Sequence, residues 1–309
     1  MDKKEFLRVW KGFWQLADPK IWIASTVPMF VAAAYAYGKT GEFDLFWFVV
    51  SVIGIYLIEI GKNAVNEFVD YKSGVDTFVT PDKRTPFSGG KKTIVEGKLT
   101  VEETVIIALV TILVSCAIGL AIVIFREPRV FIVGLAGVLI AVFYSLPPFK
   151  LSYRGFGEIA VGITFGPLIV IGMYLVMTHH VSIDVLLVSL PIGFLITNVL
   201  WINQYPDYEA DLKGHKYNLL VRIGKQKGVI VYAALYVAAY LSLALIALVT
   251  KNPIWIVTFI TIPLAVRSVN VARKYYDEIP KLVKANADTI KIYQIVGLIM
   301  ILSSLASRF

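Results

Sequence analysis

The stretch Asn66-Glu-Phe-Val-Asp70-Tyr-Lys-Ser-Gly74-Val-Asp76 directly follows an apolar run that is long enough to cross a bilayer. Carboxylates are costly at the end of a transmembrane helix, so a cluster of them there predicts a function. Asn66 and Asp70 are four residues apart and share one face of a helix. Gly74 allows a turn that brings Asp76 back toward them. Oxygen ligands of this kind suit Mg²⁺, which usually binds one or two carboxylates together with substrate phosphate oxygens.

A second copy of the motif, Asn203-Gln-Tyr-Pro-Asp207-Tyr-Glu-Ala-Asp211, ends another apolar run. We interpret the two copies as an internal duplication whose halves face each other across one site. The alternative is a pair of unrelated polar helix caps, because Asn and Asp favour helix ends. Acid clusters rarely occur at membrane depth without a function, which favours the site. The predicted Mg²⁺ ligands are Asn66, Asp70, Asp76, Asn203, Asp207 and Asp211.

The composition is that of a membrane protein. Of the 309 residues, 57% are hydrophobic and 17% are charged, and the mean hydropathy is +0.72. The formal charge of +8 lies in the short connections between apolar runs, so we attribute it to membrane topology and expect no nucleic-acid partner. The single cysteine excludes a disulfide framework. Residues 1–18 are basic and aromatic with helical spacing, which predicts an interfacial helix.

Nine apolar runs are candidate spans, which predicts an all-α polytopic protein formed by one domain, 1–309. Most lysines and arginines fall on one side of this arrangement, which predicts that the N-terminus is inside and the C-terminus outside. Both acidic motifs then face the cytoplasm of a multi-pass protein in the cell membrane. Segments 67–100 and 204–227 are the expected cytoplasmic cap loops. The expected spans are 19–37, 45–66, 101–125, 129–145, 156–177, 182–203, 227–249, 252–271 and 289–306.

Two internal loops carry candidate anion-binding residues. Loop 67–100 has basic residues around Gly89-Gly90, including Arg84 and Lys91, which could close over an anionic group. Topology alone also accounts for lysine and arginine there. In loop 144–158 the pair Pro147-Pro148 holds the chain extended. This rigidity would direct Tyr144, Lys150 and Arg154 toward phosphate oxygens, although an ordinary tight connection has the same pattern.

Facing carboxylate clusters beside basic loops form a site for a polyanion bridged by divalent cations. A diphosphate placed beneath apolar helices could extend a hydrocarbon tail into the membrane, which predicts an isoprenyl diphosphate substrate. Loss of the diphosphate would leave an allylic carbocation, from which water must be excluded. The predicted catalytic residues are Asp70, Asp76, Asp207, Asp211, Tyr144 and Lys150. The predicted diphosphate-binding residues are Asn66, Asn203, Arg84, Lys91 and Arg154.

Together the two acidic motifs, the segment Tyr144-Ser-Leu-Pro-Pro-Phe-Lys150-Leu-Ser-Tyr153-Arg154-Gly and the later Arg222-Ile-Gly224 resemble the UbiA superfamily of intramembrane prenyltransferases. The resemblance implies nine transmembrane helices around a central cavity that opens laterally to lipid. It also implies that Mg²⁺ and the prenyl diphosphate bind at the two acidic motifs.

Within that family, the chain looks most like the branch that prenylates 1,4-dihydroxy-2-naphthoate in menaquinone synthesis. That branch commonly has Arg-Pro where this chain has Asp18-Pro19. Geranylgeranylglyceryl phosphate and 4-hydroxybenzoate are alternative acceptors for the same chemistry. An alternative from another class is a secondary transporter with an intramembrane cation site, in which Pro206 would break a helix.

Overall fold

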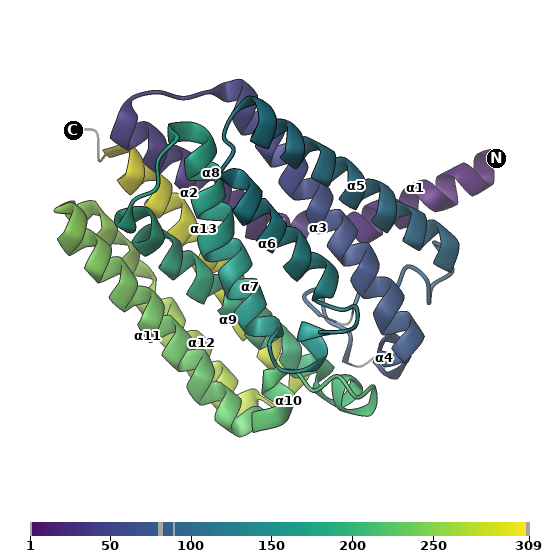
Figure 1. The fold of residues 1–309 in the computed structure, drawn as a ribbon. Helices are drawn as coiled ribbons and strands as arrows, with labels where there is room; N and C mark the ends of the chain where they lie inside the picture. The colour runs from purple at the N-terminus through teal and green to yellow at the C-terminus, as the bar shows by residue number, and fades with distance from the viewer. Residues whose placement is uncertain (1, 80–82, 89, 307–309) are drawn as a thin grey trace.

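The computed structural model describes residues 2–79, 83–88 and 90–306, and this part of the chain is built from helices (Figure 1). Its only β-type pairing is an isolated bridge between Thr85 and Ser88. The helices before the middle of the chain are α1 Lys3–Ala17, α2 Ile23–Thr40, α3 Leu45–Ser73, α4 Val75–Phe78, α5 Val101–Phe125 and α6 Val130–Phe143. The later ones are α7 Gly157–Ile163, the π-helical η4 Thr164–Leu168, α8 Ile169–Thr178, α9 Ile183–Lys213, α10 Leu219–Ile223, α11 Lys225–Thr250, η5 Pro253–Thr261, α12 Ile262–Tyr275 and α13 Ile279–Ala306.

Within the described residues, seven helical stretches are long and apolar enough to cross a membrane, and an eighth forms if α1 to α2 is counted as one span bent by 50°. The remaining predicted span falls on α6, an apolar helix of 14 residues that is shorter than the helices counted here as candidate spans. The all-helical membrane architecture predicted from the sequence is therefore confirmed. The apolar runs coincide with helices because no water is available inside a bilayer to satisfy backbone N–H and C=O groups.

Small residues let the helices approach closely, as is usual in membranes. A Cβ added at Gly193 of α9 would lie 2.8 Å from the carbonyl oxygen of Gly162 in α7. A Cβ added at Gly61 of α3 would lie 2.5 Å from Ile112 of α5. These contacts fix α7 on α9 and α3 on α5, so the helices that carry the two acidic motifs are held in a defined frame.

The main hydrophobic core lies among α2, α8, α9, α11 and α13. By contrast, α6 has no buried residue and lies at the edge of the bundle beside α3 and α8 (Figure 1). The loose packing of α6 leaves space on its inner side, and this space forms the cavity described below.

The two motif helices extend beyond the predicted spans. Helix α3 continues to Ser73 and ends at Gly74, whose φ of 80° favours glycine. Helix α9 continues to Lys213 and passes through Pro206 without a break. The first residues of the expected cap segments 67–100 and 204–227 are therefore helical. Because α9 is continuous, the broken helix on which the transporter alternative depended is not found.

Candidate active site

A lysine joins the two acidic motifs. The Lys216 ammonium donates a hydrogen bond to Asp70 Oδ2 at 2.9 Å and lies 3.9 Å from Asp211 Oδ1. Burial lowers the Lys216 pKa, but the carboxylates of Asp70 and Asp211 outweigh this effect and hold the pKa well above its usual range. The sequence predicts that the motifs of α3 and α9 face one site, and in the structure Lys216 contacts both of them.

Asp70 is buried and its oxygens are oriented by neighbours. Asn66 Nδ2 donates to Asp70 Oδ2 at 2.9 Å, as expected for two residues four apart on a helix. Tyr153, which follows the proline pair, donates from its hydroxyl to Asp70 Oδ1 at 2.6 Å. Ser145 Oγ donates to Asn66 Oδ1 at 2.7 Å. Loop 144–158 therefore positions the first motif.

Asp76 returns toward the motif after the turn at Gly74, as the sequence predicts. Its helix α4 packs on α9 so closely that a Cβ at Gly214 would lie 2.2 Å from Val75. Asp76 is buried and its Oδ2 has no hydrogen-bond partner among the described residues. Burial, reinforced by the charges of Asp70 and Glu67, raises the Asp76 pKa to about 8. The charges of Lys216 and Lys92 act in the opposite direction on the Asp76 pKa, but they do not outweigh burial.

The second motif is oriented by residues of α10 and α13. The buried Asp211 accepts a hydrogen bond at 2.7 Å from Asn218, the N-cap residue of α10. Asn203 Oδ1 accepts one at 2.8 Å from Asn286 of α13. Asp207 lies one turn from each on the same face of α9 and is half-buried. All six predicted metal ligands therefore belong to the two facing helix ends and α4.

The basic loop after α4 places two adjacent lysines differently. Lys91 pairs with Asp18, whereas Lys92 is 4% exposed and its ammonium has no hydrogen-bond partner among the described residues. Burial, together with the nearby Arg84, lowers the Lys92 pKa, and the carboxylates of Asp76 and Asp207 oppose that effect. Lys92 is therefore a cation on the acidic site that sequence reasoning did not select.

The other predicted cations lie farther out. Arg84 lies 4.0 Å from Glu96, and Arg154 is exposed to solvent. The ammonium of Lys150 lies over the ring of Tyr153, 5.3 Å from its centroid. Tyr144, the C-cap residue of α6, lines the cavity described next. Part of the predicted Gly-rich loop, residues 81, 82 and 89, lies outside the described residues.

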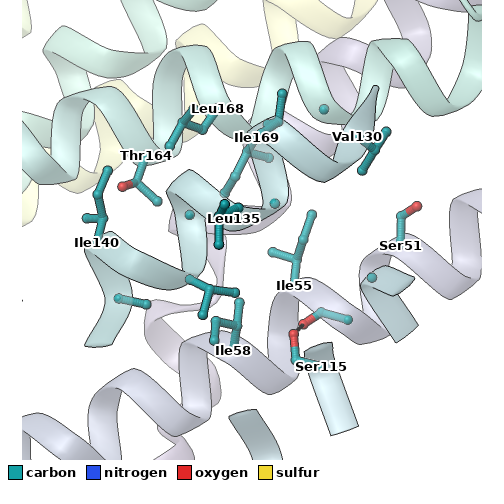
Figure 2. Close-up of a pocket in the computed structure, with 18 of the residues that line it drawn as sticks. Ser51, Ile55, Ile58, Ser115, Val130, Leu135, Ile140, Thr164, Leu168 and Ile169 are labelled. Atoms are coloured by element: carbon teal, nitrogen blue, oxygen red, sulfur yellow. Dashed lines mark hydrogen bonds between the residues drawn. The ribbon is translucent and has the colours of Figure 1, made fainter. Parts of the chain in front are cut away.

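A cavity of about 370 Å³ lies between α3, α5, α6 and the α7–η4–α8 segment. Its lining is mainly aliphatic, with glycines at 119, 134 and 137, where a Cβ would meet nothing within 4 Å. Figure 2 shows side chains from three sides of it: Ile55, Ile58, Leu135, Ile140, Thr164, Leu168 and Ile169. The cavity is suited to a hydrocarbon chain.

The oxygen atoms of the two acidic motifs suit a Mg²⁺ ion that binds together with the substrate's phosphate groups. Among the described residues, no three acidic, histidine or cysteine side chains lie close enough to hold an ion by themselves. In the part of the chain that the structure describes, Asp76 Oδ2 nevertheless lacks a hydrogen-bond partner, and Asp70 and Asp211 share a lysine ammonium where a cation would compensate them. Mg²⁺ usually takes one or two carboxylates and completes its shell with phosphate oxygens and water, which matches this incomplete set.

The comparisons with known proteins agree with this geometry. A model of the "UbiA prenyltransferase family" matches residues 26–288. The chain belongs to the UbiA prenyltransferase family. It is therefore a membrane prenyltransferase, as predicted from its acidic motifs and proline loop.

This UbiA-family chain is 28% identical over 259 residues to the 1,4-dihydroxy-2-naphthoate octaprenyltransferase of Bacillus subtilis, covering 83% of this chain and 80% of the relative. It is 28% identical over 253 residues to UbiA prenyltransferase domain-containing protein 1 of Dictyostelium discoideum, covering 80% and 74%. A UbiA homologue from Archaeoglobus fulgidus, solved with GPP and Mg²⁺, superposes with a TM-score of 0.69 at 18% identity, covering 96% of this chain and 99% of that one. The last comparison confirms the fold.

Two site residues were missed by the sequence reasoning, Lys216 and Lys92. Lys92 belongs to a loop that contacts the motifs only through the tertiary fold, so no local spacing indicates it. The signal for Lys216 was its place five residues after Asp211. Glu67 was also missed, and it accepts hydrogen bonds from the backbone of Lys92 and Ile94, at 3.1 Å each. This bonding turns the loop inward.

Proposed function

We propose that this prenyltransferase transfers a polyprenyl group from an isoprenyl diphosphate to 1,4-dihydroxy-2-naphthoate, in a Mg²⁺-dependent reaction of menaquinone biosynthesis. The observation that carries the proposal is the position of the Lys216 ammonium between Asp70 and Asp211, on helices of which α3 also lines an apolar cavity. Anionic groups facing each other across a cation at the end of a hydrophobic cavity suit an amphiphile with a diphosphate head.

The residues of both motifs would hold the metal: Asn66, Asp70, Asp76, Asn203, Asp207 and Asp211. When bound, Mg²⁺ would neutralise the leaving diphosphate. Lys92 and Lys216 would contact the diphosphate as the allylic C–O bond breaks, and fixed cations in a dry site stabilise developing charge effectively. Arg84, Lys91, Lys150 and Arg154 would reach it only by leaving their present positions. Tyr144 would stand beside the allylic carbon.

The acceptor assignment is supported by relatives that carry the name 1,4-dihydroxy-2-naphthoate octaprenyltransferase in Bacillus subtilis, Haemophilus influenzae and Escherichia coli, at 27–28% identity. The same proposal places the protein in the cell membrane with nine spans, the N-terminus inside and the acidic site facing the cytoplasm. The positions of lysines and arginines support that orientation.

A direct test offers the purified protein geranylgeranyl diphosphate with and without Mg²⁺, and supplies 1,4-dihydroxy-2-naphthoate, 4-hydroxybenzoate and geranylgeranylglyceryl phosphate in separate reactions. We expect Mg²⁺-dependent release of pyrophosphate and a prenylated product with the naphthoate. Turnover with one of the other acceptors alone would overturn the acceptor assignment. Folded protein without turnover on any of them would overturn the proposed function.

A further inference from the structure

The wall of the cavity just below the first acidic motif carries two opposite charges. Glu59 and Lys62, both on α3, line the cavity together with Ser25 of α2 and Tyr144. Most of the remaining lining is aliphatic (Figure 2). Ionisable side chains inside a membrane are costly, and they usually mark a substrate or ion path. These two residues have no part in the metal and diphosphate chemistry described above.

Among the described residues, Glu59 and Lys62 do not form an ion pair with each other. Glu59 is 6% exposed and accepts a hydrogen bond from the Ser25 hydroxyl. Lys62 makes no hydrogen bond or ion pair among the described residues, and its ammonium lies over the Tyr144 ring, 5.6 Å from the centroid. The cavity wall thus offers one cation and one hydrogen-bond acceptor to a ligand. A purely hydrocarbon occupant would satisfy neither of them.

The position of the pair relative to the diphosphate site follows from helix geometry. Residues 59, 62, 66 and 70 share one face of α3. With a rise of about 1.5 Å per residue, Lys62 lies about 6 Å and Glu59 about 10 Å below Asn66 along the helix axis. An allylic carbon bonded to a diphosphate at the motif would therefore lie near the level of Lys62, where an attacking ring must also be placed.

We propose that Lys62 and Glu59 bind the acceptor, Lys62 by pairing with an anionic carboxylate and Glu59 by accepting a hydrogen bond from a ring hydroxyl. The assignment rests on the proposed function and names its acceptor class, a hydroxylated aromatic acid. Thr164 also lines the cavity, and its buried Oγ1 has no hydrogen-bond partner among the described residues, so it offers a further polar contact. The same Lys62 ammonium could instead serve the donor diphosphate, and the experiment below separates the two anions.

The experiment measures steady-state kinetics of the purified, Mg²⁺-loaded protein with geranylgeranyl diphosphate and 1,4-dihydroxy-2-naphthoate, varying each in turn. For Lys62→Met we expect the KM for the naphthoate to rise about tenfold or more, the size of one lost charge-assisted hydrogen bond. The KM for the diphosphate should stay within about twofold. In Lys62→Arg the KM for the naphthoate should return most of the way to the wild-type value. Lys72 is an exposed lysine on the same helix, so Lys72→Met is the matched control.

A second substrate isolates the carboxylate. The acceptor 1,4-dihydroxynaphthalene lacks the carboxyl group, so the wild type and Lys62→Met should have similar KM values for it. The preference of the wild type for the naphthoate should therefore disappear in the variant. Glu59→Gln should raise the KM for both ring acceptors. If the Met variant does not fold, as judged by its melting temperature, Lys62→Gln replaces it.

A Lys62 variant with an increased KM for the diphosphate alone would assign the ammonium to the donor and overturn the proposal. Unchanged kinetics for both substrates would overturn it too. Failure of the proposed function looks different, because the wild-type protein would then form no product with the naphthoate, and that result would overturn this assignment as well.

Discussion

The Lys216 ammonium lies 2.9 Å from Asp70 Oδ2, although the two residues are 146 positions apart in the chain. The same ammonium lies 3.9 Å from Asp211, so one side chain bridges the two acidic motifs. Buried carboxylates that face each other need a counter-charge. Lys216 provides it in this structure, and a divalent cation bound with diphosphate would provide it during the reaction.

Replacing Lys216 by Met should therefore lower the melting temperature of the metal-free protein by several degrees, because two buried carboxylates lose their counter-charge. Addition of Mg²⁺ and pyrophosphate should raise the melting temperature more in Lys216→Met than in the wild type. Tryptophan fluorescence during heating measures both effects. Lys213→Met, at an exposed position nearby, is the control. Equal melting temperatures and equal responses to Mg²⁺ would contradict the bridging role.

The neighbouring lysines Lys91 and Lys92 offer a matched pair. Lys92→Met should raise the KM for the prenyl diphosphate about tenfold, since its buried ammonium faces the acidic site. Lys91→Met should have a smaller effect because Lys91 pairs with Asp18. Initial rates at varied diphosphate concentration distinguish the two variants. The opposite ranking would mean that the loop rearranges when substrate binds.

Gly137 on α6 should help to set the length of prenyl chain that the cavity accepts. A Cβ at this position meets nothing within 4 Å, so a larger side chain would enter open space. Gly137→Leu should favour geranyl over geranylgeranyl diphosphate, measured as the ratio of their kcat/KM values. Ala136→Leu adds a similar volume to the same helix at a residue that does not line the cavity. An unchanged ratio in Gly137→Leu would place the tail elsewhere.

Glu127, between α5 and α6, gives a prediction for pH. It is 3% exposed and accepts hydrogen bonds from Arg129 Nε at 2.7 Å and, in one tautomer, from His179 Nδ1 at 2.8 Å. The bond from Arg129, helped by His179, lowers the Glu127 pKa from 4.5 to about 2. A lowered pKa in the folded state stabilises the protein fully above about pH 4.5, and this stabilisation disappears as the pH falls toward 2.

Glu127→Gln should therefore have a lower melting temperature than the wild type at pH 7. The difference between the two melting temperatures should become smaller between pH 4.5 and pH 3. Thermal melts across this range test the prediction, with the exposed Glu42→Gln as control. If the difference in melting temperature between the wild type and Glu127→Gln grew as the pH fell, the predicted direction of the pH dependence would be wrong.

Much of the fold could be predicted because the apolar runs and the repeated Asn-x-x-x-Asp spacing are local patterns. They indicated the helices, and they indicated which oxygens share a face of α3 and of α9. The choice between Lys91 and Lys92 could not be predicted, because adjacent lysines look alike in sequence. Lys92 turns inward because its backbone N–H bonds to the buried Glu67 and its φ is 56°, features that only the folded loop provides.

The charges inside the third helix are a different case. Glu59 and Lys62 lie within an apolar run of the sequence, and their cost at membrane depth is a signal that the residues alone already carried. What the sequence could not show is that both line a cavity and that, among the described residues, neither forms an ion pair. That arrangement depends on α6, whose loose packing opens the space beside them.

The most direct test of the two-motif site compares Mg²⁺-dependent pyrophosphate release by the wild type, Asp70→Ala and Asp207→Ala, using the exposed Asp277→Ala as control. We predict that each motif variant loses about two to three orders of magnitude in kcat while its melting profile remains that of a folded membrane protein. Near-normal, Mg²⁺-dependent release by either motif variant would contradict a site in which both motifs hold one metal and diphosphate.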